Sequence, residues 1–161
     1  AALNEAVWNL LPTLLKRFQI VHLCGKGKAN PAYNGTEGYV QFEYINKELR
    51  DIFAASSLVI SRAGANAICE LLALKKPNIL IPLTAAARRG DKILNAASFE
   101  QQGYSYLLRE EELTNETLLA AINEVSENSD RYLEAMKNKA GNDATQTICA
   151  MIEDLIGREE Q

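Results

Sequence analysis

Residues 57–83, SLVISRAGANAICELLALKKPNILIPL, decide the fold class of this chain. The stretch begins with an apolar run at 57–61, and a second apolar run follows at 78–82. Runs without polar alternation are typical of inner strands in a parallel sheet that is covered on both faces. Between them, apolar residues at helical spacing begin after Gly64 and stop at Lys75. The stretch therefore predicts a strand, a helix and a second strand of one buried parallel sheet.

The same alternation of strands and helices continues on both sides of this stretch. Before it we expect a helix over 1–17, strands at 18–24 and 39–44, and a short helix from about 49. After it we expect a helix over 91–102, a strand at 104–108, and helices from 114, over 130–140 and over 143–157. This order predicts an α/β fold with a parallel sheet. A chain of 161 residues fits one such domain, so residues 1–161 are expected to form a single domain.

Composition excludes several classes of function. The chain has 17 basic and 21 acidic residues and a net charge of -4, which argues against nucleic acid as a partner. The sequence contains neither an apolar run of about 20 residues nor a secretory leader, so we expect a soluble, intracellular protein. Cys24, Cys69 and Cys149 lack the spacing of a zinc site, and we expect them to be reduced core residues.

The turn after the strand at 57–61 is the first candidate binding element. Ligands of open parallel sheets bind beyond the carboxyl ends of the strands. Here Arg62, Ala63 and Gly64 lead directly into a helix, whose free backbone N–H groups and dipole favour a phosphate. The alternative is that Gly64 only lets the chain turn tightly.

Two further candidates lie on the neighbouring helices. Glu70 stands on an otherwise apolar helix, and its carboxylate could accept hydrogen bonds from a ribose diol. A pair between Glu70 and Lys75 is the ordinary alternative. The segment 88–92, followed by Asn95, could converge on a sugar or a diphosphate. Otherwise it is a solvated loop in which Asp91 caps the next helix.

Two other features are predicted to be structural. Residues 25–28, GKGK, lack the spacing and the hydroxyl residue of a phosphate-binding loop, so we interpret them as a turn. His22 is the only histidine and lies within an apolar strand, so it is expected to be a structural residue rather than a metal ligand.

Taken together, these stretches resemble the C-terminal domain of the MurG-like glycosyltransferases, glycosyltransferase family 28. The resemblance runs through most of the chain. Its landmarks are residues 2–4, residues 44–49, the stretch 61–83, and GDKILNAASFEQQG at 90–103. The stretches 61–83 and 90–103 are the specific part of the resemblance, and the flanking similarity is loose.

The resemblance implies the GT-B architecture, in which two Rossmann-like domains face a cleft and the C-terminal domain binds the donor. It also implies the site residues of a UDP-sugar. The N–H groups near Gly64, Ala65 and Asn66 would hold the diphosphate, Glu70 would bind the ribose, and the loop around Asn46 would meet uracil. Asp91, Lys92 and Asn95 would face the sugar, and Arg62 is a further candidate for binding the UDP-sugar.

The family transfers N-acetylglucosamine from its UDP ester to an undecaprenyl-diphosphate-linked muramoyl pentapeptide in peptidoglycan synthesis. The resemblance implies an inverting reaction without metal or other cofactor. It places the lipid-linked acceptor, the membrane contact and the catalytic base in an N-terminal acceptor domain. We therefore expect no catalytic residue in this chain, no transfer by the chain alone, and a full-length protein that is cytoplasmic and peripheral at the inner face of the membrane.

The sequence departs from the family pattern in two places. Lys92 stands where many relatives carry glutamine, and the family's Gly-Gly-Ser turn with its strand would lie upstream of Ala1. Three alternatives therefore stay open. They are the donor domain of a glycolipid (diacylglycerol) transferase, a non-catalytic partner subunit of a split transferase, and a nucleotide-binding α/β domain without sugar chemistry.

Overall fold

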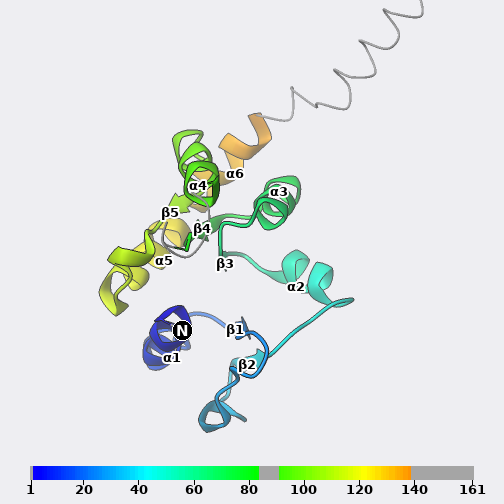
Figure 1. Cartoon of the computed structure of the whole chain (residues 1–161), viewed down its shortest axis with the longest axis vertical. Helices are drawn as coiled ribbons and strands as arrows, with labels where there is room; N and C mark the ends of the chain where they lie inside the picture. The colour runs from blue at the N-terminus through cyan, green and yellow to red at the C-terminus, as the bar shows by residue number, and fades with distance from the viewer. Residues whose placement is uncertain (1, 84–90, 139–161) are drawn as a thin grey trace, which may run out of the picture.

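The computed structural model describes residues 2–83 and 91–138, except for the side chains of Asp91 and Lys92 (Figure 1). The helices are α1 (Ala2–Leu14), α2 (Leu49–Ala55), α3 (Ala65–Ala73), α4 (Asp91–Gln101), α5 (Asn115–Glu127) and α6 (Ser129–Asn138). The strands are β1 (Ile20–Leu23), β2 (Tyr39–Phe42), β3 (Val59–Ser61), β4 (Asn78–Leu80) and β5 (Tyr106–Leu107). Two short 3₁₀ helices, η1 (Pro31–Tyr33) and η2 (Glu110–Glu112), complete the description. The predicted helix over 143–157 lies outside the described residues.

All strand pairs in the described residues are parallel, which confirms the predicted α/β fold. The strands form two sheets, β1–β2 and β3–β4–β5, instead of one. Among the described strands β3 pairs with β4 alone and ends the three-stranded sheet, so the predicted inner position of the strand at 57–61 is wrong there, whereas its predicted coverage on both faces is confirmed. This coverage explains its apolar character. Ile60 and Val59 pack against cores on opposite faces of the sheet, so both faces of an edge strand are covered.

The three-stranded sheet lies between two layers of helices. Helices α1, α5 and α6 pack with Ile79 and Ile81 on one face. Helices α3 and α4 pack with Leu80 on the other face. These three consecutive apolar residues are fully buried, and their alternation between the two cores is the period of two expected of a strand. This layering holds the first turns of α3 and α4 at the carboxyl ends of β3 and β4.

The β1–β2 sheet buries one face against α1. On that face His22 Nε2–H donates to Asn4 Oδ1 at 3.3 Å, and His22 Nδ1 shares a hydrogen bond with the Tyr39 hydroxyl at 3.0 Å. The Trp8 indole N–H donates to the same tyrosine oxygen at 2.9 Å. His22 is buried, and burial lowers its pKa from the ordinary value. The prediction that His22 is structural is confirmed.

The opposite face of β1–β2 is apolar and exposed. Val21 pairs in register with Val40, and Leu23 with Phe42. The exposed fractions of these four side chains lie between 39% and 44%. The β1–β2 pair is therefore covered by described residues on one face only.

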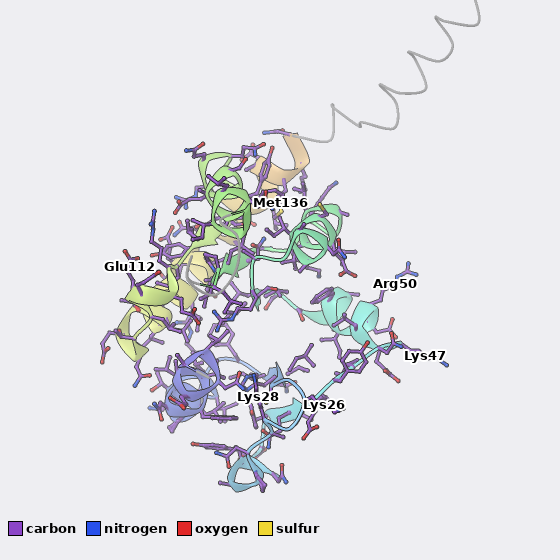
Figure 2. All side chains as sticks on the ribbon, in the orientation of Figure 1. Lys26, Lys28, Lys47, Arg50, Glu112 and Met136 are labelled. Atoms are coloured by element: carbon purple, nitrogen blue, oxygen red, sulfur yellow. The ribbon has the colours of Figure 1, made fainter. Side chains whose placement is uncertain are left out.

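The predicted turn at 25–28 is confirmed. The Lys28 N–H donates to the Gly25 carbonyl at 3.1 Å, and Gly25 and Gly27 have φ of 91° and 68°. Lys26 and Lys28 are exposed on this turn (Figure 2).

The prediction for the cysteines is correct for Cys24, which is buried, and wrong for Cys69, which is exposed on α3. Cys69 lies between Ile68 and Leu71, the buried residues of α3, but it faces away from the core. The spacing of apolar residues in the sequence does not distinguish these two sides of the helix. Cys149 lies outside the described residues. Within the described part of the chain, no helix is both long and apolar enough to cross a membrane.

Candidate functional site

The turn between β3 and α3 is held by its own backbone. The Gly64 N–H donates to the Arg62 carbonyl at 2.7 Å, and the Ser61 hydroxyl donates to the same oxygen at 3.1 Å. Ala63 is fully buried in the core between the sheet and helices α3 and α4. The turn therefore presents Arg62 and Gly64 at the carboxyl end of β3 in a fixed geometry.

The structure gives Gly64 no conformational reason to be glycine. Its φ of -77° and ψ of 139° are ordinary for any residue. A Cβ atom added there would meet no atom of the described residues within 4 Å. The alternative that Gly64 only allows a tight turn is therefore wrong. What the glycine provides is open space in front of α3.

The start of α3 has the properties of an anion site. Gly64 is the N-cap residue and supplies no side-chain cap. The first hydrogen bond of the helix runs from the Ile68 N–H to the Gly64 carbonyl at 3.0 Å. Ala65 and Asn66 precede it and are exposed. Backbone N–H groups at the first turn, together with the helix dipole, favour a negatively charged ligand at this position.

Arg62 crosses the carboxyl edge of the sheet from β3 toward β5. Its Nη1 atom lies 2.8 Å from Glu110 Oε1 and donates to the Ile81 carbonyl at 3.3 Å. The Arg62 side chain is 31% exposed and the Glu110 side chain 19%. The guanidinium is therefore fixed by two acceptors and still reaches solvent.

Glu70 lies on α3 with its carboxylate in solvent. Among residues 2–83 and 91–138, no cation comes within ion-pair distance of it, so the described part of the chain does not support the alternative pairing with Lys75. Six residues of helix separate Glu70 from Gly64, a rise of about 9 Å.

The other predicted site residues are distributed over two further elements. Asn95 is exposed on α4, which contacts α3. Asp91 and Lys92 begin α4, as the predicted start at 91 requires, but their side chains and residues 88–90 lie outside the described part. Asn46 is exposed between β2 and α2, where its carbonyl accepts the Leu49 N–H at 3.4 Å. Arg62, Gly64, Ala65 and Asn66 thus form one continuous element, whereas Asn46 follows the other sheet.

Sequence reasoning missed Glu110 and the Ile81 carbonyl as neighbours of Arg62. No motif marks either residue. The available signal is positional, because Ile81 follows β4 and Glu110 follows β5. The carboxyl ends of parallel strands lie at the same edge of a sheet, so residues after three such strands can meet.

The described residues also bear on whether clustered side chains could bind a metal ion. In the described ranges, no group of three or more His, Cys, Asp or Glu side chains is arranged to hold a metal ion. Arg62 lies in the turn before α3, and its guanidinium contacts Glu110 and the Ile81 carbonyl at the carboxyl edge of the sheet.

Comparison with known proteins gives relatives along most of the chain. It is 67% identical over 152 residues to the UDP-N-acetylglucosamine–N-acetylmuramyl-(pentapeptide) pyrophosphoryl-undecaprenol N-acetylglucosamine transferase of Lachnoclostridium phytofermentans. It is 58% identical over 151 residues to the protein of that name from Lachnospira eligens. Each match covers 94% of this chain and 43% of the relative, so the chain spans less than half the length of these proteins.

Two solved structures share the fold. The crystal structure of Acinetobacter baumannii MurG matches 95% of this chain and 46% of its own length, with a TM-score of 0.73 and 20% identity. The spinosyn forosaminyltransferase SpnP matches 84% of this chain and 34% of its own length, with a TM-score of 0.59 and 11% identity.

The Glycosyltransferase family 28 C-terminal domain matches residues 1–150, which is most of the chain. Together with the relatives above, this match agrees with the parallel α/β architecture and with the resemblance carried by residues 61–83 and 90–103. The chain belongs to glycosyltransferase family 28, as its C-terminal domain.

Proposed function

We propose that this chain is the donor-binding domain of an enzyme that transfers N-acetylglucosamine from UDP-N-acetylglucosamine to an undecaprenyl-diphosphate-linked muramoyl pentapeptide. The observation that carries the proposal is the open N-terminus of α3, where Gly64 leaves free space in front of exposed backbone. The names of the two relatives given above supply the donor and the acceptor.

The residues at this edge suit the parts of a UDP-sugar. The first-turn N–H groups of α3 would bind the diphosphate, with Arg62 opposing its charge. Glu70 would accept hydrogen bonds from the ribose hydroxyls. Asn46 would lie toward uracil, and Asp91, Lys92 and Asn95 toward the sugar. Binding of the leaving diphosphate by positive dipoles and a guanidinium favours departure of UDP from the anomeric carbon.

The rest of the reaction belongs to the longer protein that the relatives represent. In this proposal an acceptor domain binds the lipid-linked substrate and supplies the base. The full-length enzyme acts at the cytoplasmic surface of the membrane, in peptidoglycan synthesis. This chain contributes donor affinity and stabilisation of the leaving group, and no metal or cofactor is required of it.

Calorimetric titration with UDP, UDP-N-acetylglucosamine, UDP-glucose and ADP tests the proposal directly. We expect binding of the uridine nucleotides with a preference for the N-acetylated sugar, and weak or absent binding of ADP. Millimolar ligand is appropriate, since affinities in that range correspond to about 4 kcal/mol. Equal binding of ADP and UDP, or no binding of any nucleotide, would contradict the proposed donor site.

Lys92 supports one rival, a donor domain that uses a different UDP-hexose, because it replaces the glutamine of many relatives. The variant Lys92→Gln separates the two. If Lys92 contacts the sugar, the substitution changes the ranking of UDP-N-acetylglucosamine and UDP-glucose but leaves the affinity for UDP unchanged. An equal change in all three affinities would place Lys92 at the diphosphate instead. A preference of the unmodified chain for UDP-glucose would favour the rival.

A further inference from the structure

We infer that Glu110 is a positioning residue, which holds the Arg62 guanidinium in place at the carboxyl edge of the sheet before a donor arrives. This inference deepens the proposed function and rests on the donor site at the start of α3. Glu110 contacts the turn before α3 through the side chain of Arg62. It acts through the 2.8 Å contact between its Oε1 atom and Arg62 Nη1.

The geometry gives Arg62 three points of attachment. Its backbone carbonyl accepts hydrogen bonds from Gly64 and Ser61. Its Nη1 atom contacts both Glu110 and the carbonyl of Ile81. The side chain therefore extends from the end of β3, past the residue that follows β4, to the first residue of η2 after β5. A long, flexible side chain is thereby confined to one region of the edge.

The contacts leave part of the guanidinium available. Arginine carries five N–H donors, and both contacts that the structure shows use Nη1. The side chain remains 31% exposed. An arginine held in this way can add a donor to an incoming phosphate without first losing its rotamer freedom, which is the general advantage of preorganisation. The partly exposed pair itself is expected to add little to stability.

The surroundings of Glu110 offer a matched control. Glu112 lies in the same 3₁₀ helix, carries the same charge and is exposed (Figure 2). Its backbone carbonyl accepts the Thr117 hydroxyl at 2.7 Å, a contact that does not depend on its side chain. Glu112→Ala therefore changes the net charge and the composition of η2 as Glu110→Ala does, but leaves the contact with Arg62 intact.

The first test measures binding of UDP and uridine to the chain and to three variants. We expect Glu110→Ala to weaken UDP binding by about three- to tenfold, the value of one immobilised side chain, and to leave uridine binding unchanged. Glu110→Gln, which keeps an acceptor oxygen, should weaken UDP binding less than Glu110→Ala does. Glu112→Ala should bind UDP as the unmodified chain does. In an Arg62→Gln background, Glu110→Ala should have no further effect on UDP affinity, because the group that it positions is gone.

Two results would overturn the inference. If Glu110→Ala binds UDP more tightly, Glu110 competes with the phosphate for Arg62 instead of positioning it. If Glu110→Ala lowers only the free energy of unfolding and leaves UDP binding unchanged, the pair is merely structural.

A second measurement needs no ligand and so separates this inference from the proposed function. In the ligand-free chain, the NMR signal of the Arg62 Nε–H group should show restricted motion. That restriction should be lost in Glu110→Ala and kept in Glu112→Ala. An Arg62 side chain that is equally mobile in all three proteins would contradict the inference even if UDP binds. Failure of UDP to bind a chain with a rigid Arg62 would count against the donor site alone.

Discussion

Gly64 and Gly103 both lie at the end of a structural element, but the chain needs them for different reasons. Gly103 follows α4 with a φ of 73°, a left-handed conformation that disfavours any side chain, and an added Cβ would lie 3.5 Å from the Ala135 Cβ. Gly64 has an extended backbone and free space around it. The same substitution therefore has different expected effects at the two positions.

We expect Gly64→Ala to leave the fold intact and to change the free energy of unfolding by less than about 1 kcal/mol, because alanine restricts the unfolded chain but is a poorer N-cap residue than glycine. Its methyl group would occupy space in front of α3, so UDP binding should weaken. Gly103→Ala should instead cost roughly 1–2 kcal/mol of stability. Urea unfolding and calorimetric titration of both variants measure the two effects. Undiminished UDP affinity in Gly64→Ala would remove the diphosphate from this position.

Glu70 gives a second prediction at this scale. If its carboxylate accepts ribose hydroxyls, Glu70→Ala should weaken UDP binding by about 1.5–3 kcal/mol, the range for a hydrogen bond to a charged group. Its stability should barely change, since the side chain is exposed. Glu100, an exposed glutamate on α4, provides a control variant on the neighbouring helix. Equal UDP affinity of Glu70→Ala and the unmodified chain would exclude Glu70 from the site.

At the scale of elements, the β1–β2 sheet is coupled to α1 through the ring of His22. Burial lowers the pKa of His22 below 6.5 in the folded chain, so the unfolded chain binds the proton more readily. Stability from the neutral histidine is therefore complete above about pH 6.5 and is lost as the pH falls toward the lowered pKa. Burial likewise raises the pKa of Tyr39 to about 12, so its hydroxyl stays protonated throughout this range.

We expect the free energy of unfolding to fall between pH 7 and pH 5, by about 1.4 kcal/mol for each unit by which the His22 pKa is lowered. The variant His22→Gln keeps a donor and an acceptor but does not titrate there, so its stability should depend less on pH over the same interval. Urea unfolding at several pH values compares the two proteins. Parallel pH profiles would show that carboxylates, and not His22, cause the acid sensitivity.

The sequence predicts the positions of helices and strands better than it predicts which of them pack or pair with one another. Helix and strand positions follow from local patterns, so the predicted helix at 91–102 and strand at 78–82 correspond to α4 and β4. The pairing of strands depends on contacts distant in sequence, and for this reason the apolar run at 57–61 was mistaken for an inner strand. The Arg62–Glu110 pair was missed because nothing local to either residue indicates which groups lie across the sheet edge.

The prediction for Gly64 illustrates the limit at the site. The sequence alone shows that Gly64 is a glycine that follows a predicted strand, and this position predicts a phosphate-binding turn. Only the backbone angles could distinguish a glycine required by the turn from a glycine that leaves space. Asp91 and Lys92 remain predictions, since the described part of the structure gives their place at the start of α4 and not their side chains.

At the scale of the whole molecule, the chain spans 43% of the length of each of the two relatives named above, and the proposed reaction needs the acceptor domain. We therefore expect no sugar transfer by this chain alone. A polypeptide that includes the acceptor domain should transfer N-acetylglucosamine to a lipid-linked muramoyl acceptor, as measured by UDP release. Glu70→Ala in that longer protein should lower the rate. Transfer by the isolated chain would contradict this division of roles, and activity on mixing two separate chains would indicate a split enzyme.

The only tryptophan of the chain, Trp8, has a consequence for optical measurements. Its indole stacks on the Tyr33 ring at 5.8 Å and bonds to the Tyr39 hydroxyl, so its emission reports on the packing of α1 against the β1–β2 sheet. The three-stranded sheet and the start of α3 contain no comparable fluorophore in the chain. A fluorescence signal that stays constant during a nucleotide titration would therefore say nothing about binding at α3. A fluorescence melting curve would follow the packing of α1, which contacts both the β1–β2 sheet and the core that contains Ile79 and Ile81.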